Sequence, residues 1–151
     1  MSPLIESYAL VGNTRTAALI GRDGSVDWLC LPRFDAGACF AGLLGGPEHG
    51  RWLLAPAEPS TVVRRYVQDT MVLETEFETA TGRVVVVDFM PLGGEGDDLV
   101  RIVRGVAGRV DMRMELVLRF EYGSIVPWVE REGTRVHAIA GPDAVCLDTP
   151  V

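Results

Sequence analysis

The sequence contains no lysine, so all 14 of its basic residues are arginines. This absence excludes a catalytic or Schiff-base lysine within the chain. Acidic residues number 21, and the net charge of −7 argues against a basic phosphate-binding face and against nucleic acid as a partner. No apolar run approaches the roughly 18 residues that a membrane span requires. The N-terminal stretch also lacks a basic segment followed by an apolar one, so we expect neither a membrane anchor nor a secretory signal.

Cysteine and histidine are also scarce. The three cysteines are Cys30, Cys39 and Cys146. Because their number is odd and no CxxC spacing occurs, they predict no disulfide framework, and we interpret them as reduced thiols of a cytoplasmic protein. His49 and His137 lie in no motif that pairs histidine with a cysteine nucleophile, although such a pair is formally possible. Since neither metal-ligand spacing nor a phosphate loop occurs, we expect no metal and no cofactor.

Apolar residues make up 48% of the chain, and they recur with a period of two. In residues 111–122, DMRMELVLRFEY, apolar and charged side chains alternate, which predicts a half-buried antiparallel strand of about ten residues. Residues 71–91 predict a hairpin whose return strand, 84–89, is apolar enough to be covered on both faces. A second hairpin is predicted around the turn GRDG, residues 21–24. Further strands are expected at 51–55, 61–68, 99–106, 134–140 and 144–148.

Roughly ten or eleven short strands at this spacing predict an all-β fold, an antiparallel β-sandwich formed by a single domain over residues 1–151. At most one short helix is expected, near residues 35–44, with Asp35 as its N-cap and Gly45–Gly46 at its end. Residues 148–151 follow directly on a predicted strand, so we expect the chain to continue elsewhere as a longer protein.

A stretch near the N-terminus, GRDGSVDWLCLPRFD, gathers side chains that a sugar site would use. Glycoside hydrolysis needs two carboxylates roughly 5–10 Å apart, and Asp27 and Asp35, followed by Asp88, are the best candidates. The same residues also have a structural interpretation, in which Asp27 accepts backbone hydrogen bonds and Asp35 caps the helix. Because 21 acidic residues provide such a pair by chance on almost any fold, we expect a structural corner. In it, Arg33 pairs with one of the two carboxylates and Trp28 is mostly buried.

Aromatic side chains are the other feature of a sugar site, because a flat ring can stack on the C–H face of a pyranose. Trp28, Tyr122 and Trp128 are therefore candidates for contact with a sugar or with another domain. Trp128 follows Pro127, so we expect it in an irregular and partly exposed turn. The alternative for each aromatic residue is that it fills the core of the sandwich or its ends, which we favour for Trp52.

The opening IESYALVGNTRTAALIGRDGSVDWLCLPRFDAGACFAGLLGGPEHGRWLLAPA resembles the start of bacterial family 15 glycoside hydrolases, the glucoamylase-like and trehalase-like enzymes. The resemblance continues through RRYVQDTMVLETEFET, VVVVDFMP, LVRIVRGVAGRVDMRMELVLRFEYGSIVPWV and AGPDAV, so it covers essentially the whole chain. It implies a β-sandwich N-terminal domain that precedes a catalytic (α/α)6 barrel.

Members of this family hydrolyse α-linked glucosides with inversion, using an acid and a base glutamate of the barrel. Neither glutamate has a counterpart here, so the resemblance implies no catalytic residue in this chain. It implies instead that the domain supports the barrel of the same parent enzyme and walls one side of its active site. The side chains we expect at that interface are Trp28, Arg33, Tyr122 and Trp128. Exposed interface surface would also allow the isolated domain to self-associate.

Three functions are compatible with these observations. The first is a non-catalytic accessory domain of a family 15 hydrolase, which the motifs favour. The second is a stand-alone carbohydrate-binding module, which the exposed aromatic candidates motivate. The third is a self-sufficient hydrolase that uses Asp27 and Asp35, which the structural interpretation of both residues disfavours. Whether the parent acts on trehalose or on α-glucans is decided in the barrel, and this sequence leaves both open.

Overall fold

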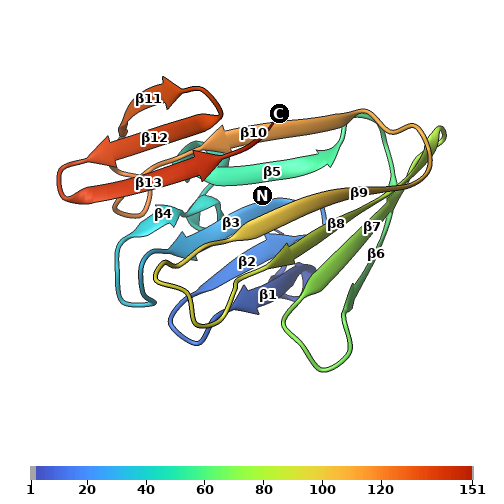
Figure 1. The fold of residues 1–151 in the computed structure, drawn as a ribbon, viewed down its shortest axis with the longest axis horizontal. Coiled ribbons are helices and arrows are strands. Elements are labelled where there is room, and N and C mark those ends of the chain that lie inside the picture. The colour runs from blue at the N-terminus through green and yellow to red at the C-terminus, as the bar shows by residue number, and fades with distance from the viewer. Residues whose placement is uncertain (1–2, 151) are drawn as a thin grey trace.

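A computed structural model of the chain describes residues 3–150, in which the regular secondary structure is almost entirely antiparallel β-sheet (Figure 1). Met1, Ser2 and Val151, which belong to the predicted domain, lie outside the described residues. Within residues 3–150 there are thirteen strands: β1 (Tyr8–Gly12), β2 (Ala17–Gly21), β3 (Ser25–Cys30), β4 (Ala38–Phe40), β5 (Arg51–Pro56), β6 (Thr61–Tyr66), β7 (Leu73–Glu78), β8 (Gly82–Phe89), β9 (Val100–Gly108), β10 (Met112–Val117), β11 (Trp128–Glu132), β12 (Arg135–Ala140) and β13 (Asp143–Asp148).

The strands form three sheets that share one core. The largest sheet has the order β1-β2-β3-β5-β10, with β4 paired to β3, and the second has the order β6-β7-β8-β9. Apolar side chains join these two sheets: Ile20 and Val26 of the first pack in one cluster with Leu73 of the second. The third sheet, β11-β12-β13, covers one end of the sandwich and adds Ala138 to the same cluster (Figure 1). The predicted all-β sandwich is confirmed.

Both predicted hairpins are confirmed. β2 and β3 flank the turn at Asp23–Gly24, where Gly24 has a φ of +81° and a Cβ would collide with the carbonyl oxygen of Leu54. β7 and β8 form the other hairpin. Val85 and Val86 of β8 are 1% and 0% exposed, so this strand is covered on both faces, as its apolar sequence predicts.

The strand predicted over residues 111–122 ends early, because β10 spans only Met112–Val117. Beyond β10 the chain turns inward, burying Leu118 and Phe120, and Phe120 forms an isolated bridge with Ile125. Glu121 and Tyr122 adopt positive φ angles of 49° and 58°, which a strand does not permit. The alternating pattern therefore predicted the burial of these apolar side chains correctly, but not the length of the strand.

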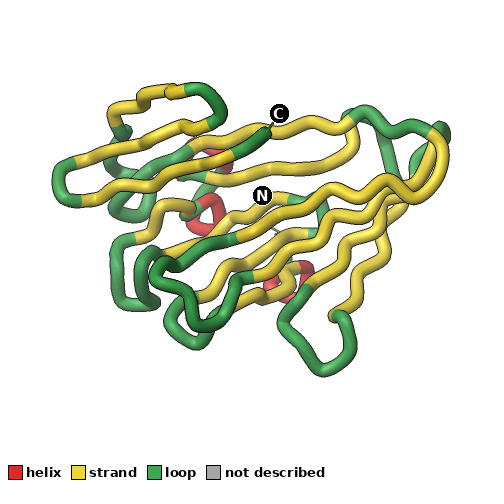
Figure 2. The backbone as a smooth tube through the Cα atoms, viewed as in Figure 1, coloured by secondary structure: helices red, strands yellow, loops and turns green. Residues whose placement is uncertain are grey.

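The short helix considered near residues 35–44 does not form. Residues Ala38–Phe40 are buried as β4, which pairs with β3, and a single 3-10 turn, η2 (Gly42–Leu44), follows. Asp35 consequently caps no helix. Two more 3-10 turns, η1 (Ile5–Ser7) and η3 (Pro47–His49), complete the helical content of the described chain (Figure 2). In this part of the chain no helix is long and apolar enough to cross a membrane.

Candidate functional site

The Asp27 carboxylate lies in β3, at an irregularity of the pairing with β2. The register between β2 and β3 shifts between Leu19 and Ile20, which marks a β-bulge that re-aims side chains. The carboxylate of Asp27 accepts hydrogen bonds from the Tyr8 hydroxyl at 2.8 Å and the Ser25 hydroxyl at 2.5 Å. Burial raises the pKa of Tyr8, and the hydrogen bond to Asp27 raises it further, so the phenol keeps the proton that it donates. Both oxygens of the buried carboxylate are therefore engaged within the corner.

Trp28 and Tyr122 form an aromatic pair beside this corner. Their ring centroids lie 5.9 Å apart, and the ring planes are tilted by 33°. Trp28 is half-buried and packs against a small cluster formed by Cys30, Ala38 and Ala41. Tyr122 is 45% exposed. Tyr122 is thus the outer ring of the pair, and it is available for contact.

Arg33 and Asp35 pair with each other on an exposed loop. The Arg33 guanidinium donates to the Asp35 carboxylate through Nε at 3.0 Å and Nη2 at 3.2 Å. The two residues line a shallow hollow of about 400 Å³, together with Arg15 and the exposed Phe34. Arg33 therefore pairs with Asp35 and not with Asp27. Both charges are solvated, so their attraction is screened and stabilises the fold little.

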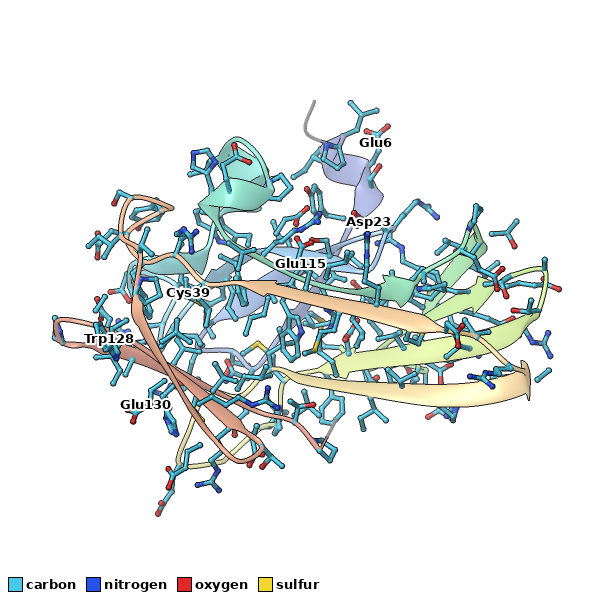
Figure 3. All side chains as sticks on the ribbon, turned by 90° about the horizontal axis from the view of Figure 1, so that it is seen from above. Glu6, Asp23, Cys39, Glu115, Trp128 and Glu130 are labelled. Carbon is cyan, nitrogen blue, oxygen red and sulfur yellow. The ribbon has the colours of Figure 1, made fainter. Side chains whose placement is uncertain are left out.

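Trp128 is the first residue of β11, at the end of the molecule formed by the third sheet. Its side chain is 77% exposed, and Ile139, its register partner on β12, is 44% exposed. Val126 and Val129 beside it are 70% and 58% exposed. Figure 3 shows Trp128 and Glu130 at this end, away from Glu6 and Asp23. We define the β11 patch as the exposed apolar side chains Val126, Trp128 and Ile139, of which the last two are partners across the β11–β12 ladder.

The six residues selected from the sequence thus take part in separate sets of contacts. Asp27 is tied to hydroxyls, the Arg33–Asp35 pair lies on a separate loop, and the aromatic residues contribute to a surface. Among residues 3–150 no group of three or more His, Cys, Asp or Glu side chains could hold a metal ion. Burial raises the pKa of the Cys39 thiol to about 12, so this thiol stays protonated and is a poor nucleophile.

The most completely buried ion pair among residues 3–150 lies within the second sheet, and its arginine reaches across to the first sheet. Arg101 of β9 donates to Asp88 of β8 through Nε at 2.8 Å, and the two side chains are 0% and 1% exposed. The guanidinium also donates to the carbonyl oxygens of Trp52, at 2.7 Å, and Gly24, at 2.8 Å, both of which belong to the first sheet or its turn. It lies 5.2 Å from the centroid of the Trp52 ring. Arg101 therefore joins the sheets through three contacts, to the two carbonyl oxygens and to the Trp52 ring, and Asp88 of its own sheet serves as its counterion.

Sequence reasoning considered Asp88 only as a third carboxylate and missed Arg101. The available signal was a single charge within each of two apolar strands, VVVVDF and LVRIV. A charge in such a strand must be paired if it is buried, so each of these residues predicts a buried partner.

Residues 1–151 match the family of the trehalase-like N-terminal domain. The chain is similar to a trehalase of Thermoplasma volcanium, with 30% identity over 86% of this chain and 22% of the relative. It is 32% identical to a trehalase of Mycolicibacterium smegmatis, over 87% of this chain and 22% of the relative. Trehalase 1 of Sulfolobus acidocaldarius is 29% identical over 97% of this chain and 24% of the relative.

No solved structure matches the chain. The chain spans about a fifth of the length of these curated relatives. Because the family match extends over the whole sequence, the chain belongs to the trehalase-like N-terminal domain family.

Proposed function

We propose that the chain is the non-catalytic N-terminal domain of a longer family 15 glycoside hydrolase. That parent hydrolyses α-glucosides such as trehalose or α-glucans in a separate (α/α)6 barrel, and this domain supports the barrel. The observation that carries the proposal is the family match over residues 1–151 combined with relatives, named trehalase, that are several times longer. The inverting mechanism and its two glutamates belong to the barrel, as the family resemblance implies.

The contacts of the candidate carboxylates support a non-catalytic role. A general acid and a general base both need an oxygen that can reach the substrate. The Asp27 carboxylate is occupied by two hydroxyls, Asp35 by Arg33, and Asp88 by Arg101 in the interior. None of the three offers the free, adjacent pair of carboxyl groups that glycoside hydrolysis uses.

We place the contact with the barrel on the β11 patch. Exposed apolar patches on a soluble domain mark surfaces that bind other proteins or domains, and interfaces between domains bury several hundred Å². Trp128 is the residue most suited to anchor such a contact, because it is large, aromatic and 77% exposed. Trp28 and Arg33, nearer the corner, are the candidates for the rim of the active site. The free thiols are consistent with a cytoplasmic parent.

The test compares the parent enzyme with a Trp128→Ala variant and a matched Val63→Ala control. Val63 is 62% exposed on β6, outside the β11 patch, so its truncation removes apolar surface without touching the proposed contact. We expect Trp128→Ala to lower the melting temperature and the rate of trehalose or maltose hydrolysis, while Val63→Ala leaves both unchanged. If the two variants have the same melting temperature and the same hydrolysis rate, the β11 patch is not part of the interface. Full activity of a parent that lacks residues 1–151 would refute the supporting role itself.

The alternative is a stand-alone carbohydrate-binding module, which the exposed Trp128 ring and the Trp28–Tyr122 pair favour. Calorimetric titration of the chain with trehalose, maltose and longer α-glucans distinguishes the two functions. Millimolar or tighter binding that is lost in Trp128→Ala would support the module. If none of the three sugars gives a heat of binding, the result favours the accessory domain over the binding module.

A further inference from the structure

The two long seams of the sandwich, where the edges of the two main sheets meet, are built differently. At one seam the edges are β1 and β6, and the side chain of Tyr66 connects them. The Tyr66 hydroxyl accepts a hydrogen bond from the Leu10 N–H at 3.0 Å and donates one to the Leu10 carbonyl oxygen at 2.8 Å. This seam is therefore closed, because Tyr66 satisfies both main-chain groups that Leu10 presents.

The opposite seam lies between β9 and β10. These strands follow each other in the chain, but β9 pairs only with β8 and β10 pairs only with β5. Within the described part of the chain no strand pairs with the outer edge of either. Figure 1 shows the two strands diverging from their connecting turn, with the end of β13 near the wider part. Two free edges therefore offer unpaired N–H and C=O groups to an added strand.

A cleft of about 700 Å³ lies at this seam. Its walls are largely apolar and include Val103 of β9 and Met114 and Leu116 of β10. Val103 and Met114 are 44% and 42% exposed, although both lie on strands that line the sandwich interior. Partly exposed apolar side chains on two facing edges show that the core is unfinished on this side.

An unsatisfied donor marks the same cleft. Trp52 lines it, and the indole N–H of Trp52 is buried without a hydrogen-bond acceptor among residues 3–150. A buried donor without a partner is rare and costs about 1–3 kcal/mol, so native structures usually supply an acceptor. The packing around Trp52, beside the cleft, is therefore incomplete within residues 3–150.

We propose that the seam between β9 and β10 is completed by an extended, apolar segment of the longer protein, which comes from outside residues 1–151 and adds as a β-strand. This inference rests on the proposed function, because it needs a longer parent. About four fifths of each relative lies outside the matched part, so such a segment is available in the same polypeptide, at high effective concentration. A second copy of the chain is the poorer occupant, because each copy carries a net charge of −7 and the two would repel.

Hydrogen exchange of the longer protein tests the proposal. We expect peptides from β9 and β10 to exchange at least about tenfold more slowly in the longer protein than in the 151-residue chain. Peptides from β6, the edge at the closed seam, should exchange alike in both. Equal rates for β9 and β10 in the two proteins would overturn the proposal. Protection that appears in the 151-residue chain and grows with its concentration would identify a second copy as the occupant, and would overturn it too.

A charged substitution in the cleft gives a second, independent measurement. Met114→Glu places a carboxylate where the apolar segment should pack, and Met114 is exposed enough in the chain for the domain to tolerate it. In the longer protein we expect this variant to lose most of the slowing at β9 and β10, whereas the control Val63→Glu keeps it. If Met114→Glu retains the slow exchange, the segment does not occupy the cleft. The enzymatic activity of the same samples distinguishes a failure of this proposal from a failure of the proposed function. If the longer protein is active but its β9 and β10 peptides exchange as fast as in the 151-residue chain, only the seam proposal is refuted.

Discussion

Removing Arg101 should destabilise the sandwich more than any other single change to a charged residue. We consider Arg101→Met, which keeps the length and apolar stem of the side chain and deletes its guanidinium. The deletion abolishes both hydrogen bonds to Asp88, at 2.8 and 3.3 Å, and those to the carbonyl oxygens of Trp52 and Gly24. It also removes the cation from the face of the Trp52 ring. Asp88, whose side chain is 1% exposed, is left as a buried carboxylate without a counterion.

The magnitude follows from this burial. Breaking a buried ion pair by removing one partner costs about 3–5 kcal/mol, most of which is the penalty of the charge that remains. The carbonyl oxygens of Trp52 and Gly24 each lose a donor, although Gly24 keeps its hydrogen bond from the Leu54 N–H. Because the effects of groups in contact are not additive, we expect a total of about 4 kcal/mol. Since a domain of this size is stable by only about 5–15 kcal/mol, the variant should lose a large part of its free energy of unfolding.

Urea unfolding followed by tryptophan fluorescence measures the effect, because Trp52 lies beside the guanidinium. Arg104→Met on the same strand is the matched control: its guanidinium is 56% exposed and pairs with Glu74, so the change should cost less than about 1 kcal/mol. The double variant Arg101→Met/Asp88→Leu removes the stranded charge and should recover a large part of the loss. A loss below about 1 kcal/mol for Arg101→Met, or a double variant less stable than Arg101→Met, would refute the reasoning.

Three further predictions concern single contacts. Hydrogen bonds from Arg104 and then Arg65 lower the pKa of Glu74, so its stabilising contribution is present above its ordinary pKa of 4.5 and lost as the pH falls through the folded value. The difference in unfolding free energy between wild type and Glu74→Gln should accordingly shrink below about pH 4.5 in acid titrations. Because the pKa of Tyr8 is raised, absorbance titration should show one of the three tyrosines resisting ionisation above pH 10, and Tyr8→Phe should abolish that component. Gly24→Ala should destabilise far more than Gly133→Ala, since both have positive φ but only Gly24 lacks room for a Cβ, and thermal unfolding compares the two.

The strands that sequence reasoning found most clearly, such as β7, have one buried face. β7 alternates apolar and acidic residues because Leu73, Thr75 and Phe77 enter the core while the glutamates between them face outward. β11, with the sequence WVERE, was missed because all five of its residues are exposed and no alternation arises. β4 was missed because its three residues are buried together, and a run that short carries no period.

The candidate site was less predictable than the fold, because its contacts join residues far apart in the sequence. Tyr8 lies 19 positions from Asp27, and Trp52 lies 49 positions from Arg101. Such pairs depend on the order of strands within a sheet and on which sheets face each other, and the periodicity of a single strand does not contain that information. Arg33 and Asp35, by contrast, are two positions apart, and their pairing is the kind of local contact that spacing alone can suggest.

The third sheet links the two surfaces that we assign to the longer protein. β11 carries Trp128 of the β11 patch, whereas residues of β13 line the seam cleft, and β12 pairs with both strands. β12 anchors this sheet through Ala138, which is fully buried in the shared core, and Val145 of β13 packs against the same core while partly buried. A segment that fills the cleft would fix β13, and the hydrogen-bonded ladder would pass that restraint to β11 and its exposed tryptophan. Occupation of the seam and docking at the β11 patch should therefore be coupled, with each favouring the other by the same free energy. In the parent enzyme, Trp128→Ala should then lower the melting temperature less in a Met114→Glu background than in the wild type, whereas strictly additive effects would mean that the two surfaces act independently.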